Sequence, residues 1–504
     1  MKLRRNTLAL FTTVGSLLAT WVAACGGSPS TGGFTRGTGA SAVASGGGGG
    51  PSGSGGALPS SGPFGSGLGD GGLSAGSGTS CSGLACQIHA CSGGGSTTVS
   101  GTVYDPAGKN PLYGIVAYVP NTKPKAFTPG AACSSCGELY TGDPIASAVT
   151  DASGNFTITG APDGADIPLV IQVGKWRRQF TLPSVAMCQD TAVPMKLTLP
   201  KNGSEGDLPD IAISTGNADT LECLLLRVGV DASEYVPGPG GGGHIHIFTG
   251  PGGPTTQPAA PAPEKSLWDS DADIAKYDIV MLSCEGKETE NMNRQVLFDY
   301  AAAGGRVFAS HFHYAWFNGG PFGAANLATW KKGGNDIGDL HATVVTTTWD
   351  NQPFVRGQAL YDWLDGPSVN ALVSVGGPAG GASAPKELPI TTAKQNAMVA
   401  MTNTASQPWL LSDDQSQAPG WSQDFTFDTP LNTTPDKQCG RVAYSDMHVG
   451  AASGDYVTDV ITTPDGCGTM DLAPQEKALE FILFDLSACV TPNNMPQPPP
   501  TETK

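Results

Sequence analysis

Three histidines and one aspartate form the pattern in this 504-residue chain that is best suited to chemistry. His311 and His313 are two residues apart in a segment that we expect to be extended, so both side chains should point the same way. Asp446 and His448 repeat that spacing after a later apolar segment. Three imidazoles and a carboxylate suit zinc or another divalent metal ion. The same groups can act as general acid and base without a metal, and histidines packed in a core with no chemical role are the third interpretation.

Four other residues are weaker candidates. Glu285 follows an apolar segment and is a further candidate for acid–base catalysis. Its neighbour Cys284 is a possible nucleophile, although a buried or disulfide-bonded cysteine is the expected state. Trp176 and Arg177 could hold a sugar ring or an acidic polymer, but on a strand half of such residues face solvent in any case.

The candidates from Cys284 onward follow buried apolar segments, which we expect to be strands at 277–282, 306–309 and 441–444. Helical patterns lie between and after strands, at 221–228, 288–303 and 474–486. Alternating strands and helices predict a parallel sheet with helices on both faces. In such sheets ligands bind beyond the carboxyl ends of the strands.

The order of these segments, with Gly304-Gly305 before the second strand and Pro408-Trp409 before the third, resembles the ThuA-like (trehalose-utilisation) family. The resemblance implies a flavodoxin-like α/β domain at 206–490, related to class I glutamine amidotransferases. Those enzymes place a nucleophilic cysteine after the second of these strands, where this chain has Ser310 and His311. Glutaminase chemistry is therefore not expected.

The preceding region, 81–205, has the pattern of an antiparallel β-sandwich. Val99, Gly101 and Val103 alternate with polar residues, and 150–158 reads as a hairpin with an aromatic residue entering a core. The segments 100–105 and 150–156 resemble the first strand and a later hairpin of the carboxypeptidase regulatory-like domain, a transthyretin-like sandwich. The resemblance implies a non-catalytic module, which in some relatives binds glycans.

The N-terminus predicts export and a lipid anchor. A basic start and an apolar run end at Val22-Ala23-Ala24-Cys25, which resembles the lipobox of bacterial prolipoproteins. We expect residues 1–24 to be a cleaved signal peptide, Cys25 to be lipidated, and 25–80 to be a Gly/Ser-rich linker that is disordered. Gly26 stands where lipoproteins retained in the inner membrane commonly have aspartate, which favours the outer membrane, with the protein exposed to the periplasm or the cell surface. Residues 491–504 are expected to be a disordered tail.

The cysteine count indicates disulfide bonds, as expected for an exported protein. Of 12 cysteines, 11 remain after Cys25 is set aside, so at least one thiol is free or bonded to another chain. Cys439 and Cys467 are the pair that we first expect to be joined, and Cys133 and Cys136 are expected to be structural. Three further cysteines predict a small cross-linked start to the sandwich: Cys81, Cys86 and Cys91.

The function that these features favour is that of a cell-envelope lipoprotein acting as a surface binding or interaction protein. Its predicted partners are the membrane, through the lipid anchor, and a glycan or an envelope protein. A nucleic-acid partner is excluded by a net charge of −17 and by the lack of long basic runs. The alternative is a carbohydrate-directed hydrolase or a metal-dependent enzyme that uses the ThuA-like region. The sequence identifies no cofactor, and a divalent metal such as zinc is the candidate.

Overall fold

The computed structural model describes residues 81–134, 136–333, 337–375, 384–412, 420–449 and 462–503. The predicted signal peptide, Cys25 and the linker lie outside these residues. The described residues all belong to one compact unit, so the predicted boundary near residue 206 stays a prediction. None of the described helices combines the length and the apolar character needed to cross a membrane.

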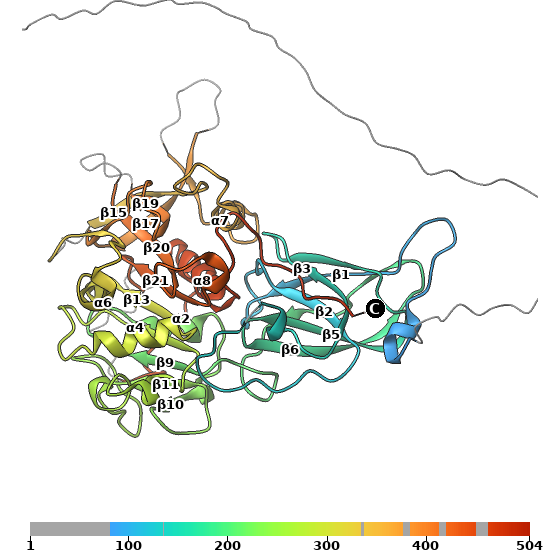
Figure 1. The fold of residues 1–504 in the computed structure, drawn as a ribbon, viewed down its shortest axis with the longest axis horizontal. Coiled ribbons are helices and arrows are strands. Elements are labelled where there is room, and N and C mark those ends of the chain that lie inside the picture. Colours follow the sequence, from blue (N-terminus) through green and yellow to red (C-terminus); the bar gives the residue numbers. More distant parts are fainter. Residues whose placement is uncertain are drawn as a thin grey trace, which may run out of the picture. The chain divides into compact units, whose positions relative to one another are not determined.

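The first part of the chain forms two sheets that share a hydrophobic core (Figure 1). One has the order β4-β1-β7, with β8 also paired to β1, and the other has the order β3-β2-β5-β6. The pairs are antiparallel except that β7 and β8 run parallel to β1. The strands are β1 (Thr98–Tyr104), β2 (Val116–Pro120), β3 (Pro144–Val149), β4 (Asn155–Thr159), β5 (Gly164–Val173), β6 (Trp176–Val185), β7 (Asp190–Ala192) and β8 (Leu197–Thr198). The predicted β-sandwich is confirmed.

The second part forms an eleven-stranded mixed sheet with the order β10-β11-β9-β12-β13-β21-β20-β19-β15-β17-β16 (Figure 1). The first six strands are parallel, and the other five add to them antiparallel. The strands are β9 (Ile211–Ser214), β10 (Tyr235–Pro237), β11 (Ile245–Phe248), β12 (Ile279–Leu282), β13 (Arg306–Ser310), β15 (Ile337–Val344), β16 (Val373–Ser374), β17 (Lys386–Ala393), β19 (Gln407–Ser412), β20 (Ser422–Thr429) and β21 (Gly440–Ser445).

The prediction of a parallel sheet is thus right for one half of this sheet and wrong for the other. A parallel connection needs a crossover of roughly a dozen residues or more, which is usually helical. The connections from β19 to β20 and from β20 to β21 are shorter than that, so these strands pair antiparallel.

Alternate residues of the parallel strands enter two different cores, one on each face of the sheet. In β9, Ile211 and Ile213 lie in one core and Ala212 lies in the other, and in β12 Met281 and Val280 divide in the same way. The first core is covered by α2 (Leu221–Arg227), α7 (Val355–Asp365) and α8 (Pro474–Ser487), and the second by α4 (Arg294–Ala302), α5 (Tyr314–Phe317) and α6 (Gly320–Gly323). Strands buried on both faces explain the continuous apolar runs in the sequence.

Helix α4 starts six residues later than expected, because Asn293 caps it by accepting a hydrogen bond from the backbone N–H of Val296. The remaining short elements are α1 (Cys136–Leu139), α3 (Asp271–Ile274), β14 (Thr329–Trp330), β18 (Ala397–Met398), η1 (Gly83–Gln87), η2 (Ala232–Glu234), η3 (Pro263–Lys265), η4 (His311–His313) and η5 (Pro435–Lys437).

The disulfides differ from the expected pairing. Cys439 is bonded to Cys133, and Cys467 is bonded to Cys223, so the predicted Cys439–Cys467 bond is wrong. Cys439 lies just before the amino end of β21, whereas Cys467 follows the carboxyl end of that strand in the chain. Each is instead next to a cysteine that is 306 or 244 positions away, a pairing that spacing in the sequence does not reveal.

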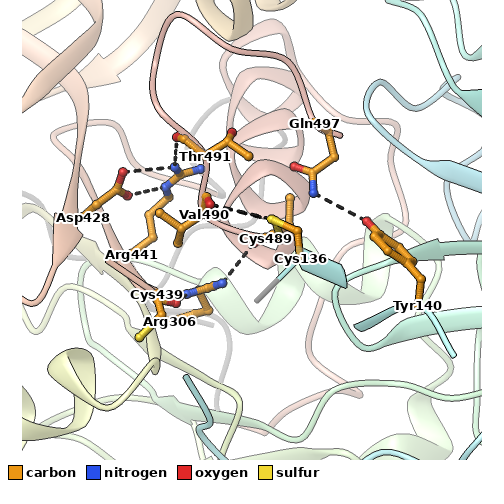
Figure 2. Close-up of a disulfide and its surroundings, with 11 residues drawn as sticks. Cys136, Tyr140, Arg306, Asp428, Cys439, Arg441, Cys489, Val490, Thr491 and Gln497 are labelled. Atoms are coloured by element: carbon orange, nitrogen blue, oxygen red, sulfur yellow. Dashed lines mark hydrogen bonds and ion pairs between the residues drawn. A yellow bond between two sulfur atoms is a disulfide. The ribbon is translucent and has the colours of Figure 1, made fainter. Parts of the chain in front are cut away.

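The other bonds are Cys136–Cys489, drawn in Figure 2, Cys91–Cys188 and Cys81–Cys86. Cys133 and Cys136 are therefore structural, as predicted. Among the described cysteines only Cys284 is free, in agreement with the odd count.

The C-terminal residues 491–503 contact the sandwich, and the prediction of a disordered tail is wrong. Thr491 and Gln497 are buried, and the amide of Gln497 reaches the hydroxyl of Tyr140 (Figure 2). The backbone N–H and hydroxyl of Ser147 both donate to Glu502 Oε1, at 3.0 and 3.1 Å. These polar contacts fix a segment whose composition alone gave no sign of order.

Candidate functional site

The carboxyl ends of β12, β13 and β21 lie side by side. Leu282 is in register with Ala309, and Ala309 with Tyr444. The residues that follow these three strands therefore meet at one edge of the sheet, where ligands of such sheets bind.

Cys284, His311 and His448 form a cluster at this edge. Each of the three side chains offers a ligand atom, and these atoms all lie within 4.8 Å of one another. The Cys284 sulfur is 3.0 Å from Nδ1 of His311, and the rings of His311 and His448 have their centroids 5.1 Å apart. The three residues are 0, 1 and 5 % exposed, in that order.

Local backbone geometry brings His311 into the cluster. The chain leaves β13 at His311 with a φ of +42°, a value uncommon for residues other than glycine, and then forms the 3-10 turn η4. The hydroxyl of Tyr444 lies 2.7 Å from the carbonyl oxygen of His311 and donates to it. Strain of this kind persists only where the surroundings hold it, and it is found most often at functional sites.

Burial keeps all three groups of the cluster neutral. It lowers the pKa of His448 to about 3 and that of His311 well below its usual range, and it raises the pKa of the Cys284 thiol to about 12. The Nε2 atoms of both histidines are buried and have no hydrogen-bond partner among the described residues. Each neutral imidazole therefore keeps a nitrogen lone pair for a metal ion.

His313 lies outside this cluster, so its predicted place among the metal ligands is wrong. Its Nε2 atom bonds the carbonyl oxygen of Ser283 at 2.9 Å, and its Nδ1 atom bonds the hydroxyl of Thr289 at 2.8 Å. Burial lowers the pKa of His313 to about 4. The reason for the error is the 3-10 turn, because residues i and i+2 share a side in a strand and not in a helix.

Asp446 also holds structure and does not join the cluster. Its Oδ2 atom accepts the backbone N–H groups of Asn396 and Ala397, and its Oδ1 atom lies 2.7 Å from the hydroxyl of Tyr444. Burial raises the pKa of Asp446 to about 7. One oxygen is thus occupied by the loop that enters β18 and the other by Tyr444 of β21, and the predicted role as a metal ligand is wrong.

Glu285 is buried beside the cluster without being part of it. Its carboxylate oxygens have no hydrogen-bond partner among the described residues, and burial raises its pKa to about 7. A carboxyl group of this kind suits a general acid, and its catalytic role stays a prediction.

Asp219, which sequence reasoning missed, positions the loop that carries His448. Its Oδ1 atom accepts the backbone N–H of Val449 at 2.7 Å and that of Thr220 at 2.8 Å. Burial raises its pKa to about 7. The only signal in the sequence was its position in the loop after β9, at the same edge of the sheet as the candidates.

Trp176 and Arg177 are not an accessible ligand platform, contrary to the prediction. Trp176 is fully buried and packs edge to face on Phe484 of α8. Arg177 is also buried, and its Nε atom pairs with Asp207 at 2.9 Å. Both side chains stabilise the contact between β6 and its neighbours.

Comparison with known proteins identifies no family. No protein-family model and no curated protein matches the chain. Similar solved structures include a ThuA-like protein from Parabacteroides merdae, at 13 % identity and a TM-score of 0.26, covering 56 % of this chain and 96 % of that one.

Two other solved structures also have low identity and a low TM-score. A type II cohesin–X-dockerin complex from Acetivibrio cellulolyticus has 18 % identity and a TM-score of 0.16, covering 27 % of this chain and 85 % of that one. A β-galactosidase from Rahnella sp. R3 has 11 % identity and a TM-score of 0.23, covering 48 % of this chain and 29 % of that one. TM-scores of this size support no function, and the two family resemblances stay predictions.

Proposed function

We propose that this chain is an outer-membrane lipoprotein, anchored through Cys25, whose large sheet binds one thiophilic transition-metal ion through Cys284, His311 and His448. The observation that carries the metal site is the cluster itself, with three ligand atoms within 4.8 Å of one another. The anchor rests on the lipobox-like sequence alone.

The donor set indicates the class of metal. One thiolate and two imidazoles suit zinc or copper, whereas magnesium and calcium take oxygen ligands. Zinc forms bonds of about 2.0 Å to nitrogen and about 2.3 Å to sulfur, and an ion at this position would lie among three ligand atoms that are within 4.8 Å of one another. The thiol loses its proton when the metal binds.

The burial of the ligands supports binding in preference to catalysis. An ion held by these three side chains joins the ends of β12 and β13 to the loop after β21. It thereby stabilises the edge of the sheet, and the protein presents its surface to a glycan or an envelope-protein partner.

The first prediction concerns metal content. The full chain, purified without chelator, should carry about one zinc or copper ion per chain by elemental analysis. Cys284→Ser and His448→Gln should each weaken metal binding by at least about 100-fold, because losing a ligand costs more than the 10- to 100-fold of losing a group that supports one. The control is His89→Gln, which removes a half-exposed histidine far along the chain.

Asp446→Asn supplies a second comparison, since the structure assigns this carboxylate to a hydrogen-bonded loop. It should keep the metal while altering stability. Trace metal only, in protein exposed to zinc and to copper(I), would overturn the site. Equal loss in His89→Gln and His448→Gln would do the same.

A second candidate function rests on the 3.0 Å contact between the Cys284 sulfur and His311 Nδ1. Such a pair can serve a covalent hydrolase with the thiol as nucleophile and the imidazole as base, although burial opposes this proton transfer in the closed site. Alkylation separates the two functions. Rapid modification of Cys284 by iodoacetamide in the native, metal-free protein favours the enzyme, and modification only after unfolding favours the metal site.

A further inference from the structure

The described part of the chain exposes few large hydrophobic side chains, and one of them is a tryptophan. Trp349 is 50 % exposed to solvent. It lies in a turn after β15 that internal hydrogen bonds hold. The backbone N–H of Thr348 donates to the carbonyl of Gln352 at 2.9 Å, and the hydroxyl of Thr348 donates to Asp350 at 2.5 Å. The turn therefore presents the indole ring to solvent on a fixed backbone.

A cavity of about 310 Å³ lies beside this ring. Five segments of the chain line it: the turn 348–350, residues 404–407 at the start of β19, residues 426–428 of β20, Pro435 and Gln438 around η5, and residues 492–494 of the C-terminal segment. Its volume is at the lower end of the roughly 300–1,000 Å³ that small-molecule sites occupy.

The lining is polar and lacks positive charge. It consists mainly of hydroxyl, amide and carboxylate side chains, and none of the described residues that line it is a lysine or an arginine. The charge of Asp428 is balanced from behind by Arg441, whose Nε and Nη2 atoms lie 2.6 and 3.2 Å from its two oxygens (Figure 2). A phosphate or another anion would meet carboxylates here, so the cavity suits a neutral ligand.

Ser406 gives an independent sign of a missing ligand. It lines the cavity and is 6 % exposed, and its hydroxyl has no hydrogen-bond partner among the described residues. Buried hydroxyl groups are normally paired, because leaving one unpaired costs about 1–3 kcal/mol. Asn493 adds donors to the cavity, since its Oδ1 atom accepts from Arg356 at 2.5 Å and its NH₂ group is left for other partners.

We infer that this cavity is a binding site for a neutral saccharide. The apolar C–H face of a pyranose ring would pack on the indole of Trp349, and its hydroxyl groups would bond Ser406, Asn493 and the other amides of the lining. The site is separate from the metal cluster in its residues, and it stands whether or not a metal binds there.

The experiment uses saturation-transfer difference NMR of the full chain with cellobiose, maltose, N,N′-diacetylchitobiose and galactobiose, with sorbitol as an open-chain polyol. At least one disaccharide should bind saturably, with the ring C–H protons receiving the strongest transfer. Trp349→Ala should weaken that binding at least roughly tenfold, as expected for an aromatic platform. Ser406→Ala should weaken it too, and Met470→Ala, which removes another exposed apolar side chain, should not.

Three results would overturn the inference. The first is that none of the four disaccharides binds saturably at concentrations on the order of 10 mM. The second is binding that Trp349→Ala leaves unchanged while the variant keeps the unfolding midpoint of the wild type. The third is competition by inorganic phosphate, which would indicate an anion site. Trp349→Phe guards against misfolding, because it keeps an aromatic face and should retain part of the affinity.

Discussion

At the scale of single residues, the carboxyl edge of the large sheet is marked by buried acidic groups. Burial raises the pKa of Asp219 and Asp446 to about 7 and that of Glu222 to about 8. The carboxylate oxygens of Glu222 have no hydrogen-bond partner among the described residues, so little offsets the cost of ionising it. Glu222 is therefore the clearest place to test how this edge responds to pH.

Glu222→Gln should flatten the pH dependence of stability. The folded state keeps the Glu222 proton up to about pH 8, while in the unfolded chain the group titrates near the ordinary glutamate pKa of 4.5. Stability therefore falls as pH rises between those two values. From pH 5 to pH 8 the wild type should lose on the order of 3 kcal/mol more than the variant, since one pKa unit is worth about 1.4 kcal/mol.

Urea unfolding at pH 5, 6.5 and 8 measures this difference. The control is Glu290→Gln, which changes a side chain that is 67 % exposed and should follow the wild type. A variant Glu222→Gln that loses as much stability as the wild type over this range would show that Glu222 is already ionised in the folded protein.

At the scale of elements, the sequence allowed prediction of the strands that are buried on both faces, because their apolar runs are continuous. The antiparallel half of the sheet was missed, since β19 and β20 carry polar residues such as Gln407, Gln423 and Asp424 inside the fold. The site was predicted in part. His311 and His448 were placed correctly at the edge of the sheet, but the 3-10 turn that removes His313 depends on tertiary contacts and leaves no periodic signal.

One close approach between elements can be tested at Gly174, in the turn between β5 and β6. Its φ is +53°, and a Cβ atom there would lie 2.1 Å from the carbonyl oxygen of Ser487 at the end of α8. Gly160, in another turn of the sandwich, has a φ of +72° and nothing within 4 Å of such an atom. The two positions share the backbone conformation and differ in the space available.

Gly160→Ala should cost about 1 kcal/mol, the usual penalty for a left-handed residue with a side chain. Gly174→Ala should cost a further ~1–3 kcal/mol, because the backbone of α8 must shift. Urea titration of the wild type and both variants measures the two losses in the free energy of unfolding. Equal losses would mean that the hairpin and α8 do not pack against each other in solution.

At the scale of the whole molecule, the sandwich and the large sheet are joined in two ways. The disulfides Cys133–Cys439 and Cys136–Cys489 link residues 306 and 353 positions apart. The hydrophobic core also runs without a break from the sandwich to α8, where Tyr113 stacks on Phe481. The core, and not only the covalent links, should therefore make the two parts unfold together.

Replacing all four of these cysteines by serine tests that conclusion. Both the wild type and the variant should unfold in one calorimetric transition, the variant at a lower temperature, because each disulfide contributes typically about 2–4 kcal/mol. The matched control removes Cys81–Cys86, which closes a loop of only 5 positions and should have a smaller effect. If the four-cysteine variant instead unfolds in two separate transitions, the disulfides alone couple the sandwich to the sheet, and the shared core is too weak to hold them together.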